Sequence, residues 1–173
     1  MKTAQIHHIL FTLLIITLLP FRSISQCTSP INNFPYHEDF ESGPGGWANG
    51  GTSDDWTLGT PAKAIIAQAG SGTQCWITGG LTTAFYNFGE RSYVQSPCFN
   101  FTNLNHPLIH FKIYYETEYK FDGANLQYSL DAGATWTNLG TYGELNDCHT
   151  INRYNYDNIT NMTGLASPGH GWC

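Results

Sequence analysis

Acidic side chains crowd one short stretch of the chain, where Glu38, Asp39 and Glu41 lie almost side by side. Glycoside hydrolysis needs two carboxylates that face each other across a sugar, about 5–9 Å apart. In an extended strand Glu38 and Glu41 point to opposite faces, which is the wrong arrangement for that pair. The chain also lacks a His-Glu-x-x-His sequence, and no histidine stands in a context that marks a catalytic triad. We therefore predict that these residues contain no catalytic site.

The most specific motif in the chain is Ser129-x-Asp131-x-Gly133-x-Thr135-Trp136, an Asp-box. Ser and Asp side chains hydrogen-bond backbone groups inside a turn, Gly accepts a positive φ, and Trp covers the turn with apolar surface. A sialidase-like active site is the functional interpretation, but in families that carry them these boxes lie on peripheral hairpins. We predict that Ser129, Asp131, Gly133 and Trp136 form a structural hairpin clasp.

The elements that must position these residues are strands, because no long stretch has apolar residues at helical spacing. Residues 108–118 alternate apolar and polar side chains, as do residues 124–130, and the turn signal Phe121-Asp122-Gly123 joins them. This pattern predicts an antiparallel pair. Weaker candidate strands are residues 36–41, 56–58, 75–78, 83–86, 92–99, 135–139 and 151–156. Many short strands at this spacing indicate a β-sandwich or barrel.

The N-terminus has the pattern of an export signal. Lys2 precedes an apolar run at residues 9–19, which is too short to span a bilayer, and small residues at positions 23 and 25 predict cleavage after Ser25. The alternative is a lipobox ending at Cys27, which would give a lipid-anchored protein. We expect residues 1–25 to be a signal peptide, no other segment to span a membrane, and the protein to be secreted or displayed at the cell surface.

The charge and the aromatic content limit the partners. Without residues 1–25, 13 acidic side chains face five basic ones, so phosphate backbones would repel the chain and we expect no nucleic-acid partner. Aromatic residues make up 14% of the sequence. They are core material in most small β-sandwiches, and the alternative role is stacking on sugar rings. The candidates for stacking are Trp47, Trp56, Trp76, Tyr114 and Tyr119.

The cysteines indicate disulfides rather than a metal or redox centre. No two of them form a Cys-x-x-Cys pair, and export to an oxidising compartment makes disulfides the default. Their odd number leaves at least one thiol unpaired within the chain. The five are Cys27, Cys75, Cys98, Cys148 and Cys173.

The order of several motifs resembles MAM domains and the jelly-roll modules of reelin repeats and exported bacterial multidomain proteins. The motifs are Asp39-Phe40-Glu41-Ser42-Gly43, Trp47, Asp54-Asp55-Trp56, Cys75-Trp76, Ser96-Pro97-Cys98-Phe99, His106-Pro107-Leu108, Asp122-Gly123-Ala124 and the Asp-box. The resemblance implies an all-β, antiparallel jelly-roll sandwich over residues 34–173, preceded by a linker at residues 26–33. A closing Gly-Trp-x-Ile-Asp-Asp segment typical of the family does not follow Trp172, so we expect the domain to be incomplete at its C-terminus.

The same resemblance implies particular site residues. Family members often hold a structural calcium beside the first strand, so Asp39 and Glu41 are candidate Ca²⁺ ligands, with a solvated strand edge as the alternative. Cys75 and Cys98 flank neighbouring predicted strands inside the matched region, and we predict a disulfide between them.

The function implied is that of a non-catalytic adhesion or ligand-binding module, the first domain of a longer protein that binds glycan or protein partners. The alternative is an N-terminal accessory domain of a secreted hydrolase, a peptidase or glycosidase, whose catalytic domain lies elsewhere in the same polypeptide.

Overall fold

The computed structural model describes residues 27–82, 85–143, 153–162 and 169–173. Strands are the main regular elements in these ranges, and the only helix there is the single 3₁₀ turn η1 (Thr160–Met162). The expected all-β class is therefore confirmed, whereas the signal peptide lies outside the described residues. The strands are β1 (Ala48–Thr52), β2 (Thr57–Gly59), β3 (Cys75–Ile77), β4 (Arg91–Gln95), β5 (Gln127–Tyr128) and β6 (Thr137–Asn138).

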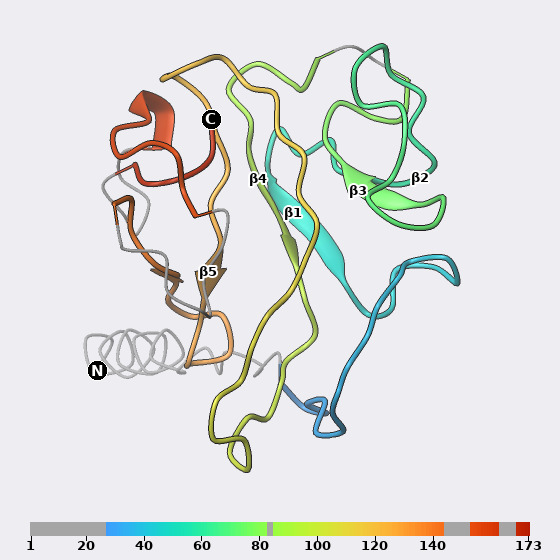
Figure 1. Ribbon diagram of the computed structural model, residues 1–173, viewed down its shortest axis with the longest axis vertical. Helices are drawn as coiled ribbons and strands as arrows, with labels where there is room; N and C mark the ends of the chain where they lie inside the picture. The colour runs from blue at the N-terminus through green and yellow to red at the C-terminus, as the bar shows by residue number, and fades with distance from the viewer. Residues whose placement is uncertain (1–26, 83–84, 144–152, 163–168) are drawn as a thin grey trace, which may run out of the picture.

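The strands form antiparallel pairs, and long irregular segments connect them (Figure 1). β1 pairs with β4, β2 with β3, and β5 with β6. Four of these strands overlap weaker candidates from the sequence: β2, β3, β4 and β6. β5 lies within the predicted strand at 124–130, and β1 falls in a stretch too glycine-rich to be predicted as a strand.

Glycine makes the β1–β4 pair possible. Gly51 has a φ of 120°, and a Cβ there would lie 2.3 Å from the Arg91 carbonyl oxygen, so only glycine allows the two backbones to approach. Gly50 is opposite Tyr93 in the register. A Cβ on Gly50 would meet the Tyr93 hydroxyl at 2.9 Å, so the tyrosine ring lies across the glycine and covers it.

Residues near the N-terminus are held against the segment that follows β4. Ile31 forms a parallel bridge with Phe99: its N–H donates to the Cys98 carbonyl, and its own carbonyl accepts from Asn100 N–H, both at 2.8 Å. This bridge places Cys27 beside Cys98, and the two form a disulfide with Cα atoms 5.5 Å apart.

The predicted Cys75–Cys98 disulfide is therefore wrong. Cys75 is a free thiol in β3, which pairs with β2 rather than with the segment that carries Cys98. Cys173 is also free, and Cys148 lies outside the described residues.

Most of the buried hydrophobic side chains come from the C-terminal segments, which return to the turn at residues 118–126. Trp172 forms an antiparallel bridge with Ala124, and Tyr156 forms one with Gly171. The Tyr154 hydroxyl accepts the Leu126 N–H at 3.0 Å and lies 3.1 Å from the Leu126 carbonyl oxygen, to which it donates. The buried hydrophobic residues in the described part of the chain are Ile77, Tyr154, Ile159, Met162 and Trp172.

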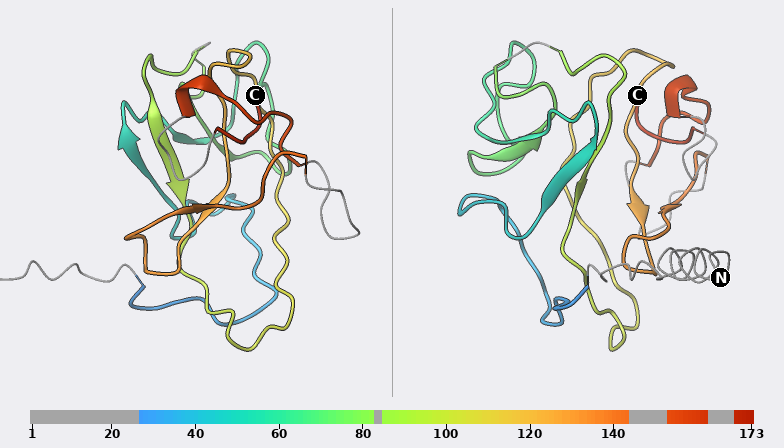
Figure 2. Two further views of the ribbon diagram at one scale, coloured as in Figure 1. Left: turned by 90° about the vertical axis from the view of Figure 1, so that its left-hand side faces the viewer. Right: turned by 180° about the vertical axis from the view of Figure 1, so that it is seen from behind.

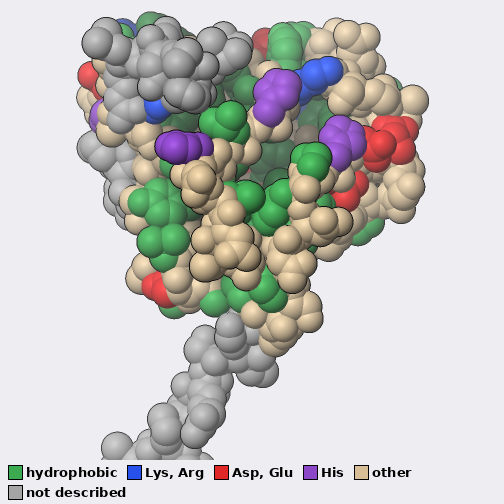
Figure 3. Space-filling model, turned by 60° about the horizontal axis from the view of Figure 1, so that its bottom comes forward, with side chains coloured by type: hydrophobic (Ala, Val, Ile, Leu, Met, Phe, Trp, Pro, Cys, Tyr) green, Lys and Arg blue, Asp and Glu red, His purple; other side chains and the backbone are tan. Residues whose placement is uncertain are grey.

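Residues 108–118, the clearest strand candidate in the sequence, do not pair with 124–130, and that prediction is wrong. The segment is extended but belongs to no ladder among the described residues (Figure 2). Residues 127–128 pair with 137–138 instead. Large hydrophobic side chains are consequently open to solvent, and Figure 3 shows such side chains reaching the surface on one face of the molecule. The exposed ones in this segment are Leu108, Ile109, Phe111, Ile113, Tyr114 and Tyr115.

Candidate functional site

The Asp-box lies on the tight connection between β5 and β6, where its polar side chains bond the turn from inside. The Ser129 hydroxyl donates to Asp131 Oδ1 at 2.7 Å and accepts the Gly133 N–H at 2.8 Å. Asp131 accepts the Thr135 N–H at 2.8 Å and the Thr135 hydroxyl at 2.6 Å. Gly133 has a φ of 89°, which explains the glycine at this position.

These bonds determine the electrostatics of the turn. The hydrogen bonds from Thr135, followed by that from Ser129, lower the pKa of Asp131 to about 2. Asp131 is therefore ionised at neutral pH, with its oxygens used inside the turn. Trp136 is only partly covered. The arrangement suits a clasp that holds the hairpin rather than an acid or base facing a substrate.

The candidate calcium ligands lie in a turn rather than a strand, because Phe40 has a φ of 63°. The predicted strand at 36–41 is therefore wrong, and so is the alternation that put Asp39 and Glu41 on one face. Asp39 Oδ1 accepts the Glu41 N–H at 3.1 Å. Hydrogen bonds from Thr73 and Gln74, led by the Thr73 hydroxyl, lower the pKa of Glu41.

The Glu41 carboxylate thus links its turn to residues 73–74 through hydrogen bonds. Thr73 N–H donates to its carboxylate at 2.7 Å and Gln74 N–H at 2.8 Å. Within the described ranges no three His, Cys, Asp or Glu side chains are grouped as a metal site would require. Calcium binding by Asp39 and Glu41 stays a prediction.

A second group of charged side chains, Asp55, Glu90 and Lys63, lies around the loop between β1 and β2. Asp55 accepts the Gly79 N–H at 2.6 Å and the Asn87 N–H at 2.9 Å, so it joins two distant loops. Partial burial raises the pKa of Glu90, and the neighbouring Asp55 carboxylate adds to that rise. Partial burial also lowers the pKa of Lys63, against the pull of both carboxylates. The sequence identified Asp55 only as part of the Asp54-Asp55-Trp56 motif and did not indicate that it lies near Glu90 and Lys63, which are distant in the chain.

Asp54 and Asp55 line an open hollow of about 410 Å³ together with residues from the β3–β4 connection. Both carboxylates are already used by the fold: Asp54 accepts the Asn49 amide at 2.6 Å and the Trp56 N–H at 3.1 Å. These aspartates therefore brace the surrounding loops.

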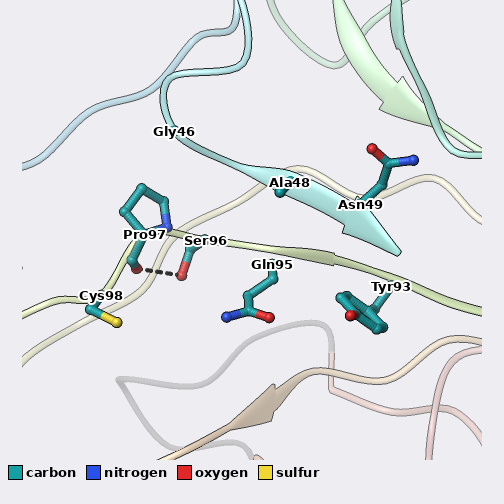
Figure 4. A pocket seen from close by; sticks show the side chains of 8 residues that line it. All are labelled: Gly46, Ala48, Asn49, Tyr93, Gln95, Ser96, Pro97 and Cys98. Carbon is teal, nitrogen blue, oxygen red and sulfur yellow. Dashed lines mark hydrogen bonds between the residues drawn. The ribbon is translucent and has the colours of Figure 1, made fainter. Parts of the chain in front are cut away.

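A smaller hollow, of about 280 Å³, lies along β1 and β4 (Figure 4). Tyr93 and Gln95 point to one side of this pair of strands in Figure 4, and Asn49 points to the other. Tyr93 is 53% exposed although its ring covers Gly50, so part of the phenol ring remains open. The lining residues are Gly46, Ala48, Asn49, Tyr93, Gln95, Ser96, Pro97 and Cys98.

The lining of this smaller hollow contains no chemistry for catalysis. It has no carboxylate, histidine or lysine, and its one cysteine is in the disulfide. The Ser96 hydroxyl donates to the Pro97 carbonyl at 2.9 Å and has no base beside it in the lining. A partly exposed aromatic ring next to amide and backbone polar groups is instead an arrangement that binds neutral polar ligands.

Comparisons with known proteins give one partial match. The chain is 27% identical over 137 residues to Bacillopeptidase F of Bacillus subtilis (strain 168), and the match covers 76% of this chain. The chain spans only 9% of the length of that relative. No family model matches the chain. No solved structure matches it either.

The remaining sequence candidates divide by exposure. Trp47, Trp56 and Trp76 are partly buried, and the Trp47 indole N–H donates to the Tyr36 hydroxyl at 3.1 Å. Tyr114 and Tyr119 are open to solvent, at 62% and 64% exposure.

Burial raises the pKa of the Cys75 thiol, which makes it a poor nucleophile. The described residues include no helix long and apolar enough to cross a membrane.

Proposed function

We propose that this chain is a non-catalytic extracellular binding module, of the MAM-like jelly-roll type, within a larger exported protein. The observation that carries the proposal is the lining of the smaller hollow, which places a half-exposed tyrosine ring beside polar residues and has no carboxylate, histidine, lysine or free cysteine. The Cys27–Cys98 disulfide adds support for an extracellular location, because such bonds persist in oxidising compartments.

The ligand class that suits the hollow best is a neutral glycan. The exposed part of the Tyr93 ring offers a flat apolar surface for a sugar ring, while polar groups of the lining offer hydrogen bonds to hydroxyls. At about 280 Å³ the hollow is at the low end of ligand pockets, so we expect it to hold one sugar residue of a longer chain. The net negative charge disfavours acidic polysaccharides.

A glycan microarray probed with the labelled chain tests this function. Tyr93→Ala should abolish binding, because it removes the stacking surface. Phe88→Ala is the matched control, since Phe88 is a fully exposed aromatic residue that does not line the hollow. A blank array, or equal loss of binding in both variants, would contradict the proposal.

The match to Bacillopeptidase F favours a second candidate, an accessory module of a peptidase. In that role the chain would bind a protein substrate and pass it to a catalytic domain elsewhere in the polypeptide. A peptide array run beside the glycan array separates the two candidates: peptide binding without glycan binding would favour the accessory role. Hydrolysis of peptides or glycans by the chain alone would exclude both.

A further inference from the structure

Residues 108–117 are extended without backbone hydrogen bonds to any other described residue. Their N–H and carbonyl groups are therefore available, and an unpaired strand of this length is a template for another strand. Tyr114 is 62% exposed and Ile113 41% exposed, so the side chains are accessible as well as the backbone.

The strand is nevertheless held in place by its neighbours. The Lys112 ammonium donates to the Gly70 carbonyl at 2.6 Å, and the Phe111 ring packs edge-on against Trp172 with centroids 5.9 Å apart. At its far end the Glu118 N–H donates to the Tyr86 hydroxyl at 3.3 Å. Because the segment is already extended, pairing it with another strand would cost less conformational entropy than pairing a flexible segment.

The sequence of the segment is complementary to itself. When two copies run antiparallel with Tyr114 opposite Tyr114, Lys112 lies opposite Glu116, and the two-fold symmetry repeats this pair. Ile113 then lies opposite Tyr115 on the other face. Lys112 uses one of its three N–H donors on Gly70, and Glu116 is exposed with no partner among the described residues, so both have capacity for the pair.

We propose that residues 108–117 are a dimer interface, in which two copies of this chain pair antiparallel about Tyr114. The pairing satisfies the open backbone groups and buries apolar side chains that one copy leaves in water. It does not depend on the proposed glycan site. A dimer would present two such sites at once, and this raises the avidity for a repetitive ligand.

Sedimentation velocity of the chain, with its free thiols blocked by iodoacetamide, measures the dimer directly. Glu116→Lys should weaken dimerisation roughly tenfold, because it replaces two opposite-charge pairs by two like-charge pairs and leaves the contact of Lys112 with Gly70 intact. Lys112→Glu should weaken it similarly. The double variant Lys112→Glu/Glu116→Lys restores opposite charges and should recover most of the wild-type affinity. Asp157→Lys, a charge reversal at an exposed residue outside the strand, should have no effect.

Thermal melting of each variant shows that it is folded. A wild-type chain that stays monomeric at the highest soluble concentration would overturn the proposal. So would single variants that dimerise like the wild type, or a double variant that fails to recover. If the wild type dimerises but a longer polypeptide containing this chain is monomeric, the strand is covered by other parts of that polypeptide, and the proposal is wrong.

Discussion

Removal of the Cys27–Cys98 disulfide should destabilise the protein strongly. The bond closes a loop of 71 residues. In the chain-entropy model, a loop of that length corresponds to about 4 kcal/mol of lost unfolded-state entropy at 25 °C. Single domains have total stabilities of about 5–15 kcal/mol, so the loss is a large share. The double variant Cys27→Ala/Cys98→Ala removes the bond without leaving a thiol at either position.

Equilibrium urea denaturation, followed by tryptophan fluorescence, measures the loss. We expect the midpoint to fall and the melting temperature to drop by roughly 10 °C. Cys75→Ala is the control, because Cys75 is a free thiol, and it should change the free energy of unfolding by about 1 kcal/mol at most. Peptide mapping that finds Cys75 bonded to Cys98, or equal destabilisation by the control, would refute the assignment.

Three further predictions concern single side chains. The folded-state pKa of Asp131 is lowered to about 2 from an ordinary value of 3.8. The ionised carboxylate therefore contributes stability above about pH 4, and this contribution is lost as the pH falls toward 2. Asp131→Asn should flatten this part of the acid denaturation curve. Trp136→Ala should lower the free energy of unfolding by about 2 kcal/mol, which is less than for a buried indole because Trp136 is only partly covered. Loss of ligand binding without a lower melting temperature would show that Trp136 contacts ligand instead. Partial burial and a hydrogen bond to Asp122 raise the pKa of Tyr86 to about 12. The neutral phenol therefore contributes its full stabilisation of the fold below pH 10, and this is lost between pH 10 and 12. Tyr86→Phe should remove one late-titrating phenol from the ultraviolet absorbance titration.

Local motifs could be predicted from the sequence because their interactions are local. Every hydrogen bond of the Asp-box joins residues at most four positions apart, so the motif contains the information needed for the turn. The short strands β2, β3 and β4 were similarly visible as β-branched and aromatic runs between turn residues.

Features that depend on distant neighbours could not be predicted in this way. The alternation in residues 108–118 indicates two faces, but a ladder also needs a second backbone, and none of the described residues provides it. The spacing of Cys75 and Cys98 says nothing about Ile31, whose bridge to Phe99 brings Cys27 to Cys98. β1 was missed because its glycines, unfavourable by propensity, are needed for close approach to β4.

The residues of the candidate site also depended on contacts that the sequence does not show. Asp39 and Glu41 were singled out because they are crowded in the sequence, but the turn at Phe40 directs Glu41 to residues 73–74. The hollow beside β1 and β4 is built from residues of ordinary type whose proximity depends on the strand register.

Glycan binding at the hollow beside β1 and β4 can be tested by a nuclear magnetic resonance titration of the isotope-labelled chain with neutral oligosaccharides of glucose, N-acetylglucosamine and mannose. It reports binding, location and turnover in one sample. We expect concentration-dependent shifts centred on Ala48, Tyr93 and Gln95, with the oligosaccharides unchanged after prolonged incubation. Shifts centred elsewhere, no shifts with any of the sugars, or the appearance of cleaved products would contradict a non-catalytic glycan-binding module.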